Sequence, residues 1–109
     1  ATAMALGEAA ALASRSGLDV GRRFDLLSRG YADSRVLRTR GVAMAAQDYR
    51  PGGLAAYMVK DLRFGADVAG AADVNPALLP VLLESYEELV DRGLGNQDLS
   101  VTRRYVEER

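Results

Sequence analysis

Cysteine, histidine and tryptophan are absent from this 109-residue chain. Without cysteine and histidine, the chain cannot form a disulfide, a zinc finger or a serine–histidine catalytic triad, and we predict no metal site. No stretch approaches the roughly 20 apolar residues that span a bilayer. The first residues also lack the basic segment of a signal peptide. We therefore expect a cytoplasmic protein that is not inserted into a membrane.

The chain also lacks a clear excess of charge of either sign. Fifteen acidic residues balance fourteen basic ones and give a net charge of −1. Nucleic-acid binding depends on clustered positive charge, so we expect no nucleic-acid partner. Apolar residues make up 49% of the chain and charged residues 27%, which is typical of a globular protein. The length suits one domain, which we assign to residues 1–109.

Lysine is almost missing as well, because Lys60 is the only one and every other basic residue is arginine. It lies in the apolar stretch 54–60. A compact ammonium group and a planar guanidinium are not interchangeable where a point charge is needed. A single retained lysine therefore invites an explanation, although on composition alone chance is the favoured one.

The pattern of apolar residues is helical almost throughout, with no alternating strand pattern. Capping residues and glycines divide it into six predicted helices over residues 3–16, 19–27, 33–46, 54–72, 78–92 and 98–106, with Gly30 closing the second. Asp19, either Asp33 or Ser34, and either Asp98 or Ser100 are the predicted N-caps. The fold class is therefore all-α. The broad apolar content of the fourth and fifth helices predicts burial on more than one side, against a partner domain or a second subunit.

The sequence contains no glycine-rich phosphate-binding motif. The helical pattern runs from the first residue without a start signal, which predicts a longer parent polypeptide. Two clusters of charged residues are interpreted as solvated helix faces. The basic group consists of Arg35, Arg38 and Arg40, and the acidic group of Glu84, Glu87, Glu88 and Asp91.

Residues 60–67 resemble the K-D-L-x-x-A-x-D cofactor-binding motif of the β-hydroxyacid dehydrogenases, the family of 3-hydroxyisobutyrate dehydrogenase and tartronate semialdehyde reductase. Gly65 takes the place of the motif's alanine. Further resemblances follow in the family's order: residues 8–19 to E-A-x-x-L-A-x-x-x-G-L-D, 32–37 to A-D-S-K-V-L, 49–52 to aromatic-x-P-G, 79–80 to L-P, and 93–100 to G-x-G-x-x-D-x-S. Together they extend over nearly the whole chain.

The resemblance implies a six-helix bundle like the C-terminal domain of 6-phosphogluconate dehydrogenase. It also implies an enzyme that transfers a hydride between NAD or NADP and a 3-hydroxy acid. Lys60 corresponds to a lysine that reaches across the interdomain cleft to the cofactor. Asp61 and Gly53 are substrate-pocket candidates, and Gly53 stands where many members have a phenylalanine. The family's Rossmann domain, which binds most of the cofactor, and its catalytic lysine lie upstream of Ala1, so the chain alone is expected to be inactive.

The expected partners are a hydroxyacid substrate, the chain's own Rossmann domain and further copies in a homodimer or tetramer. A second hypothesis is a free-standing helical oligomerisation or interaction module without catalysis, since the chain contains neither a Rossmann domain nor the catalytic lysine. Imine reductases and DNA- or histone-associated members use the same fold with other outcomes, so the fold does not by itself decide the function.

Overall fold

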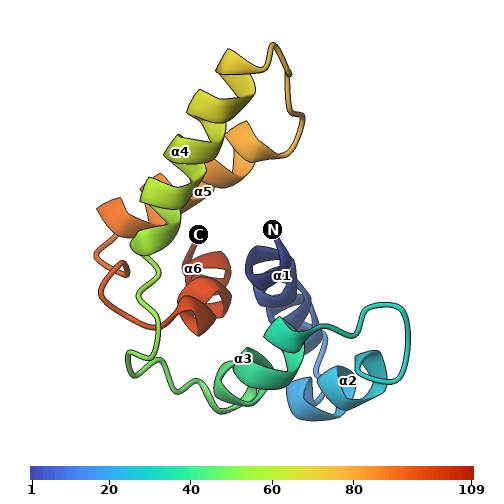
Figure 1. Ribbon diagram of the computed structural model, residues 1–109. Helices are drawn as coiled ribbons and strands as arrows, with labels where there is room; N and C mark the ends of the chain where they lie inside the picture. Colours follow the sequence, from blue (N-terminus) through green and yellow to red (C-terminus); the bar gives the residue numbers. More distant parts are fainter.

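The computed structural model describes residues 1–109 and confirms the all-α prediction (Figure 1). The helices are, in chain order, α1 (Thr2–Arg15), α2 (Val20–Leu27), α3 (Arg35–Ala46), α4 (Tyr57–Ala71), α5 (Leu79–Asp91) and α6 (Thr102–Glu108). A short 3-10 helix, η1 (Leu99–Val101), precedes α6. The only extended pairing is one isolated antiparallel bridge. None of the helices combines the length and apolar character needed to cross a membrane.

Local capping chemistry sets several helix ends as predicted. The side chains of Asp19, Ser34 and Asp98 each accept a hydrogen bond from a backbone amide two or three residues further on. They thereby satisfy one of the amide groups that the first turn of a helix leaves without a partner. α2 ends at Leu27, as predicted, and the chain then tightens into a turn in which the Gly30 amide donates to the Leu27 carbonyl.

The predicted start of the fourth helix is wrong by three residues. α4 begins at Tyr57, and Leu54 instead forms the antiparallel bridge with Asp98. The amides of Ala55 and Ala56 donate to carbonyls of residues 97 and 95, at 2.9 and 3.0 Å. Residues 53–56 are therefore held by the segment before η1 and are not free to begin a helix.

Four helices, α1, α2, α3 and α6, form a body in which α1 packs against α6 and α3 (Figure 1). One core cluster fills the space among α1, α2 and α3 and consists of Leu6, Ala10, Ala13, Val20, Phe24, Leu37 and Met44. A second joins the body to α5 and consists of Met4, Ala55, Leu82, Tyr86, Leu89, Leu94, Val101 and Tyr105. The core is thus continuous from the body into α5.

The remaining two helices, α4 and α5, pack on each other as a hairpin that projects from the body (Figure 1). α5 buries three side chains, whereas α4 has no fully buried residue. Tyr57, Phe64 and Val68 share one face of α4 and are 60%, 70% and 53% exposed. Within this chain α4 is covered only in part, so the expectation that it is buried on more than one side stays a prediction about a partner.

Candidate functional site

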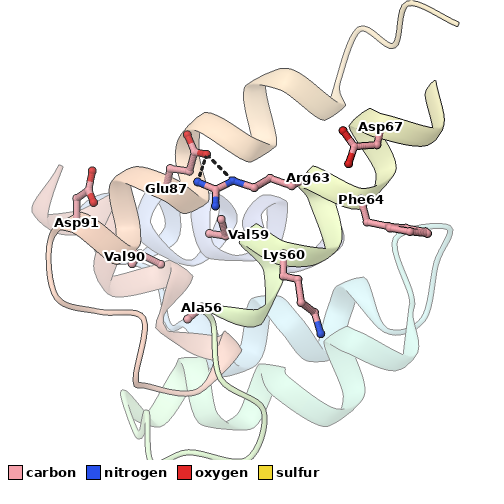
Figure 2. A pocket seen from close by; sticks show the side chains of 9 residues that line it. All are labelled: Ala56, Val59, Lys60, Arg63, Phe64, Asp67, Glu87, Val90 and Asp91. Atoms are coloured by element: carbon pink, nitrogen blue, oxygen red, sulfur yellow. Dashed lines mark hydrogen bonds and ion pairs between the residues drawn. The ribbon is translucent and has the colours of Figure 1, made fainter. Parts of the chain in front are cut away.

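The hairpin carries an open groove with a volume of about 770 Å³ between α4 and α5 (Figure 2). Its lining combines apolar side chains with two basic and three acidic ones: Ala56, Val59, Lys60, Arg63, Phe64, Asp67, Glu87, Val90 and Asp91. Six of the nine residues come from α4 or the residue before it, so the position of α4 decides the shape of the groove.

Lys60 lies in the first turn of α4, on the lining of this groove. Its side chain is exposed, and its ammonium group forms neither an ion pair nor a hydrogen bond within the chain. Figure 2 shows this side chain directed away from Arg63 and Glu87. The sequence singled out Lys60 as the only lysine, and the structure shows its charge available to a ligand.

The second cation of the groove has a partner. The Arg63 guanidinium donates to Oε1 of Glu87 from Nη2 at 2.9 Å and from Nε at 3.2 Å, which links α4 to α5 across the groove (Figure 2). Both side chains are 40% exposed or more, so solvent screens the pair and its contribution to stability is small. Arg63 is therefore occupied by Glu87, which leaves Lys60 as the unpaired cation of the groove.

The two substrate-pocket candidates lie apart from the groove lining. Asp61 follows Lys60 on α4 but points about 100° further round the helix, on the exposed face that carries Tyr57 and Phe64. Gly53 lies in the loop before α4, where its amide donates to Asp98 and its carbonyl accepts from Leu99 at 2.8 Å. The structure thus brings neither residue into the groove with Lys60.

A side chain at position 53 would approach the guanidinium of Arg40. A Cβ atom built on Gly53 lies 3.2 Å from Arg40 Nη2, and one on Gly52 lies 3.2 Å from Arg40 Nη1 and 3.1 Å from Asp98 Oδ1. A side chain larger than that of glycine at position 53 would therefore meet the Arg40 guanidinium first. Glycine at position 53 and arginine at position 40 therefore fit together.

Asp98 is the best-connected polar residue of the molecule, and the sequence identified it only as a cap. It is 3% exposed. Its Oδ1 accepts from the amides of Gly52 and Gly53, at 3.1 and 3.0 Å, and from Arg40 Nη1 at 2.9 Å, while Oδ2 accepts from Ser100 N at 2.9 Å. Burial raises the pKa of Asp98, but the hydrogen bonds from these backbone amides outweigh it and leave the pKa below its usual value.

The two charged groups of the sequence do not form sites. In the basic group, Arg40 turns inward to Asp98, and Arg38 pairs with Asp33 at 3.7 Å. In the acidic group, Glu88 accepts hydrogen bonds from Tyr105 and Arg92, which lower its pKa. No three Asp or Glu side chains lie close enough together to hold a metal ion. Arg38, Arg40 and Glu88 thus make contacts within the chain, whereas Glu87 and Asp91 line the groove.

Comparison with known protein families gives a match over nearly the whole chain. Residues 1–106 match the family described as "NAD-binding of NADP-dependent 3-hydroxyisobutyrate dehydrogenase". The 3-hydroxyisobutyrate dehydrogenase of Drosophila melanogaster, a mitochondrial protein, is 34% identical over 103 residues, which are 88% of this chain and 32% of that protein. A probable 3-hydroxyisobutyrate dehydrogenase-like mitochondrial protein of Arabidopsis thaliana is 41% identical over 66 residues, 61% of this chain and 22% of that protein.

Solved structures share the same fold. The 3-hydroxyisobutyrate dehydrogenase of Salmonella typhimurium superposes with a TM-score of 0.87 at 26% identity, over 94% of this chain and 37% of that one. The Mycobacterium tuberculosis 3-hydroxyisobutyrate dehydrogenase, solved with L-serine, gives a TM-score of 0.84 at 22% identity over 96% of this chain and 38% of that one. The chain thus spans less than two fifths of the length of each of these relatives.

Proposed function

The chain belongs to the 3-hydroxyisobutyrate dehydrogenase family, and we propose that it is the helical C-terminal domain of an NAD(P)-dependent 3-hydroxyacid oxidoreductase. In this proposal the Rossmann domain and the catalytic lysine belong to the rest of the polypeptide. Residues 1–109 alone then catalyse no hydride transfer. The domain is proposed to contribute a contact to the dinucleotide, part of the substrate pocket and the surface for assembly into a homodimer or tetramer.

The observation that carries the proposal is the unpaired charge of Lys60 on the groove between α4 and α5. An ammonium group on a helix whose neighbouring face is exposed has the position needed to reach a ligand held by another domain. The groove residues can offer a dinucleotide one positively charged contact, that of Lys60. The other cation, Arg63, is paired with Glu87, and the rest of the charged lining is acidic. When NAD or NADP is bound, it supplies the hydride acceptor or donor.

Asp61 and Gly53 are proposed to face the substrate, a small hydroxy acid. They lie outside the groove, but both are close along the chain to Lys60 and to the exposed face of α4. A substrate held between this face and the Rossmann domain would meet Asp61 from one side and the Gly53 loop from the end of the helix. A cytoplasmic location is part of the proposal.

The test compares Lys60→Ala with Arg23→Ala in the complete dehydrogenase. Arg23 is the matched control, since it is an exposed cation on α2 that forms no ion pair. A hydrogen bond to a charged group contributes roughly 1.5–3 kcal/mol, so we expect the Lys60 variant to raise the KM for NAD or NADP about 10- to 100-fold. Arg23→Ala should leave KM unchanged, and both variants should keep the helical circular dichroism spectrum. An unaltered KM in Lys60→Ala would refute the proposed contact.

A second candidate function is a helical oligomerisation module without catalysis. The exposed apolar side chains of the hairpin favour it, since Tyr57, Phe64 and Val68 together form a face suited to another protein surface. This function predicts a stable oligomer in sedimentation experiments whose size and thermal stability are unaffected by NAD or NADP. Dinucleotide-dependent oxidation of 3-hydroxyisobutyrate by the complete protein would exclude it.

A further inference from the structure

We propose that Asp98 and Arg40 are positioning residues that fix the start of α4 and thereby aim Lys60 at its ligand. The inference rests on the proposed role of Lys60. It starts from the four hydrogen bonds that converge on the Asp98 carboxylate from three parts of the chain: α3, the loop before α4 and the first residues of η1. A single buried carboxylate thus joins segments that are 45 to 58 residues apart in the sequence.

The contacts continue along the backbone to the first turn of α4. The Leu99 amide donates to the Gly53 carbonyl at 2.8 Å, and the amides of Ala55 and Ala56 donate back to residues 97 and 95. Gly95 allows this pairing, because a Cβ atom there would lie 3.2 Å from the Cβ of Ala56. The side chain of Asp98 and the chain on either side of it therefore hold residues 52–56 as one unit.

α4 depends on this unit more than the other long helices depend on their starts. Like α1 and α5, it has no capping side chain, but unlike them it has no fully buried residue to fix it in the core. Lys60 comes three residues after the helix begins, less than one turn away. A small rotation or shift of residues 53–56 is therefore carried directly into the direction of the Lys60 side chain.

Arg40 gives the buried carboxylate its counter-charge. Removing one member of such a pair leaves the other charge without compensation in a poorly solvated place. The Arg40 side chain is about one third exposed, so water can partly replace its contact with Asp98. A change at Arg40 is therefore milder than a change at Asp98 itself and suits an experiment that needs a folded protein.

The experiment is a double-mutant cycle between Arg40→Gln and Lys60→Ala in the complete dehydrogenase. Misplacement of a binding group by about 1 Å costs up to about a hundredfold, and for Arg40→Gln we expect the KM for NAD or NADP to rise on the order of tenfold. In the Lys60→Ala background, Arg40→Gln should add no further rise, because it acts only through Lys60. Arg38→Gln is the matched control on the same helix and should leave KM unchanged, since Arg38 reaches only Asp33.

Amide exchange and a conservative variant provide two further measurements. Amide hydrogen exchange should be faster at Ala55 and Ala56 in Arg40→Gln and unchanged in Arg38→Gln. Arg40→Lys keeps the positive charge and should show a smaller rise in KM; it carries the same test if Arg40→Gln does not fold. Multiplicative effects of Arg40→Gln and Lys60→Ala would overturn the proposal, because Arg40 would then act independently of Lys60. If Lys60→Ala alone has no effect, the proposed function fails, and the exchange rates still report whether Arg40 holds the loop.

Discussion

α1 and α4 are the two longest helices, with 14 and 15 residues, yet they are used in different ways. Half of the residues of α1 are buried, and most of these are small: alanine or glycine. α4 carries Tyr57, Phe64 and Val68 and buries nothing completely. Apolar content therefore does not predict which helix forms the core of this chain. The small side chains of α1 allow close packing, whereas the larger ones on this face of α4 stay exposed.

This contrast bears on function, because the proposed ligand contact is on the helix with little packing. Binding groups at a domain interface need a surface that a partner can cover, and such a surface is exposed when the domain is considered alone. The body supplies the stability. The hairpin is connected to the body by α5, through the shared core cluster, and by residues 52–56, which Asp98 holds. The predictions that follow test whether the two regions differ as described.

The largest expected difference between the body and the hairpin is in the stability lost when a large apolar side chain is truncated. Leu6 is buried in the core cluster of the body, so Leu6→Ala should lower the free energy of unfolding by about 2–5 kcal/mol. Phe64 on α4 is 70% exposed, and Phe64→Ala should change it by about 0.5 kcal/mol or less. Urea denaturation of the 109-residue chain measures both. A loss of several kcal/mol in Phe64→Ala would mean that another copy covers this face in solution, which sedimentation would then reveal.

Adding one methyl group at a helix crossing should give the next largest difference. A Cβ atom at Gly7 of α1 would lie 2.8 Å from backbone and side-chain atoms of Thr102, so the backbones of α1 and α6 must separate in Gly7→Ala. Overpacking of this kind costs about 1–3 kcal/mol. At Gly65 of α4 the nearest atom is Cδ1 of Leu79, at 3.1 Å, which belongs to a flexible side chain. Gly65→Ala should therefore be nearly neutral or slightly stabilising, since alanine is the better helix former.

Thermal unfolding of the two glycine variants side by side is the direct measurement. Equal losses of stability in both would show that α4 and α5 are packed as rigidly as α1 and α6. That result would contradict the contrast between the body and the hairpin.

The helix ends show how far local sequence determines this fold. The cap residue Asp19 was predicted correctly, and the third cap was narrowed to Asp33 or Ser34, of which the structure shows Ser34, because a cap acts within three residues of its own position. The start of α4 was not, because residues 53–56 are held by a segment some 40 residues later in the chain. No local pattern distinguishes a residue that begins a helix from one that pairs with a distant strand-like segment.

The candidate site divides in the same way. Lys60 could be identified because residues 60–67 resemble the family's K-D-L-x-x-A-x-D motif, and the structure adds that its charge is unpaired. Arg40 was assigned to a solvated face, because its partner Asp98 is 58 residues away and nothing in the sequence joins them. The roles of Lys60, Asp61 and Gly53 in binding stay predictions until the variants are measured.

The smallest expected effect concerns the place where the hairpin joins the body. Tyr86 of α5 is fully buried in the shared core cluster, and its hydroxyl group has no hydrogen-bond partner. Replacing it in Tyr86→Phe removes an unsatisfied polar atom, which should be neutral or stabilise the fold by up to about 1 kcal/mol at neutral pH. Tyr57→Phe on the exposed face of α4 is the control and should change nothing.

Alkaline pH should increase the difference between Tyr86→Phe and the unaltered chain. Burial raises the pKa of Tyr86 from its usual value of 10.0 to about 12. Between these values the unfolded chain loses the phenolic proton while the folded chain keeps it, so ionisation favours unfolding and stability falls as pH rises. The stabilisation lost is about 1.4 kcal/mol per pH unit, and Tyr86→Phe should escape it. Parallel stability curves for the two proteins between pH 10 and 12 would mean that this hydroxyl group reaches solvent, and that the hairpin and the body separate more readily than their shared core implies.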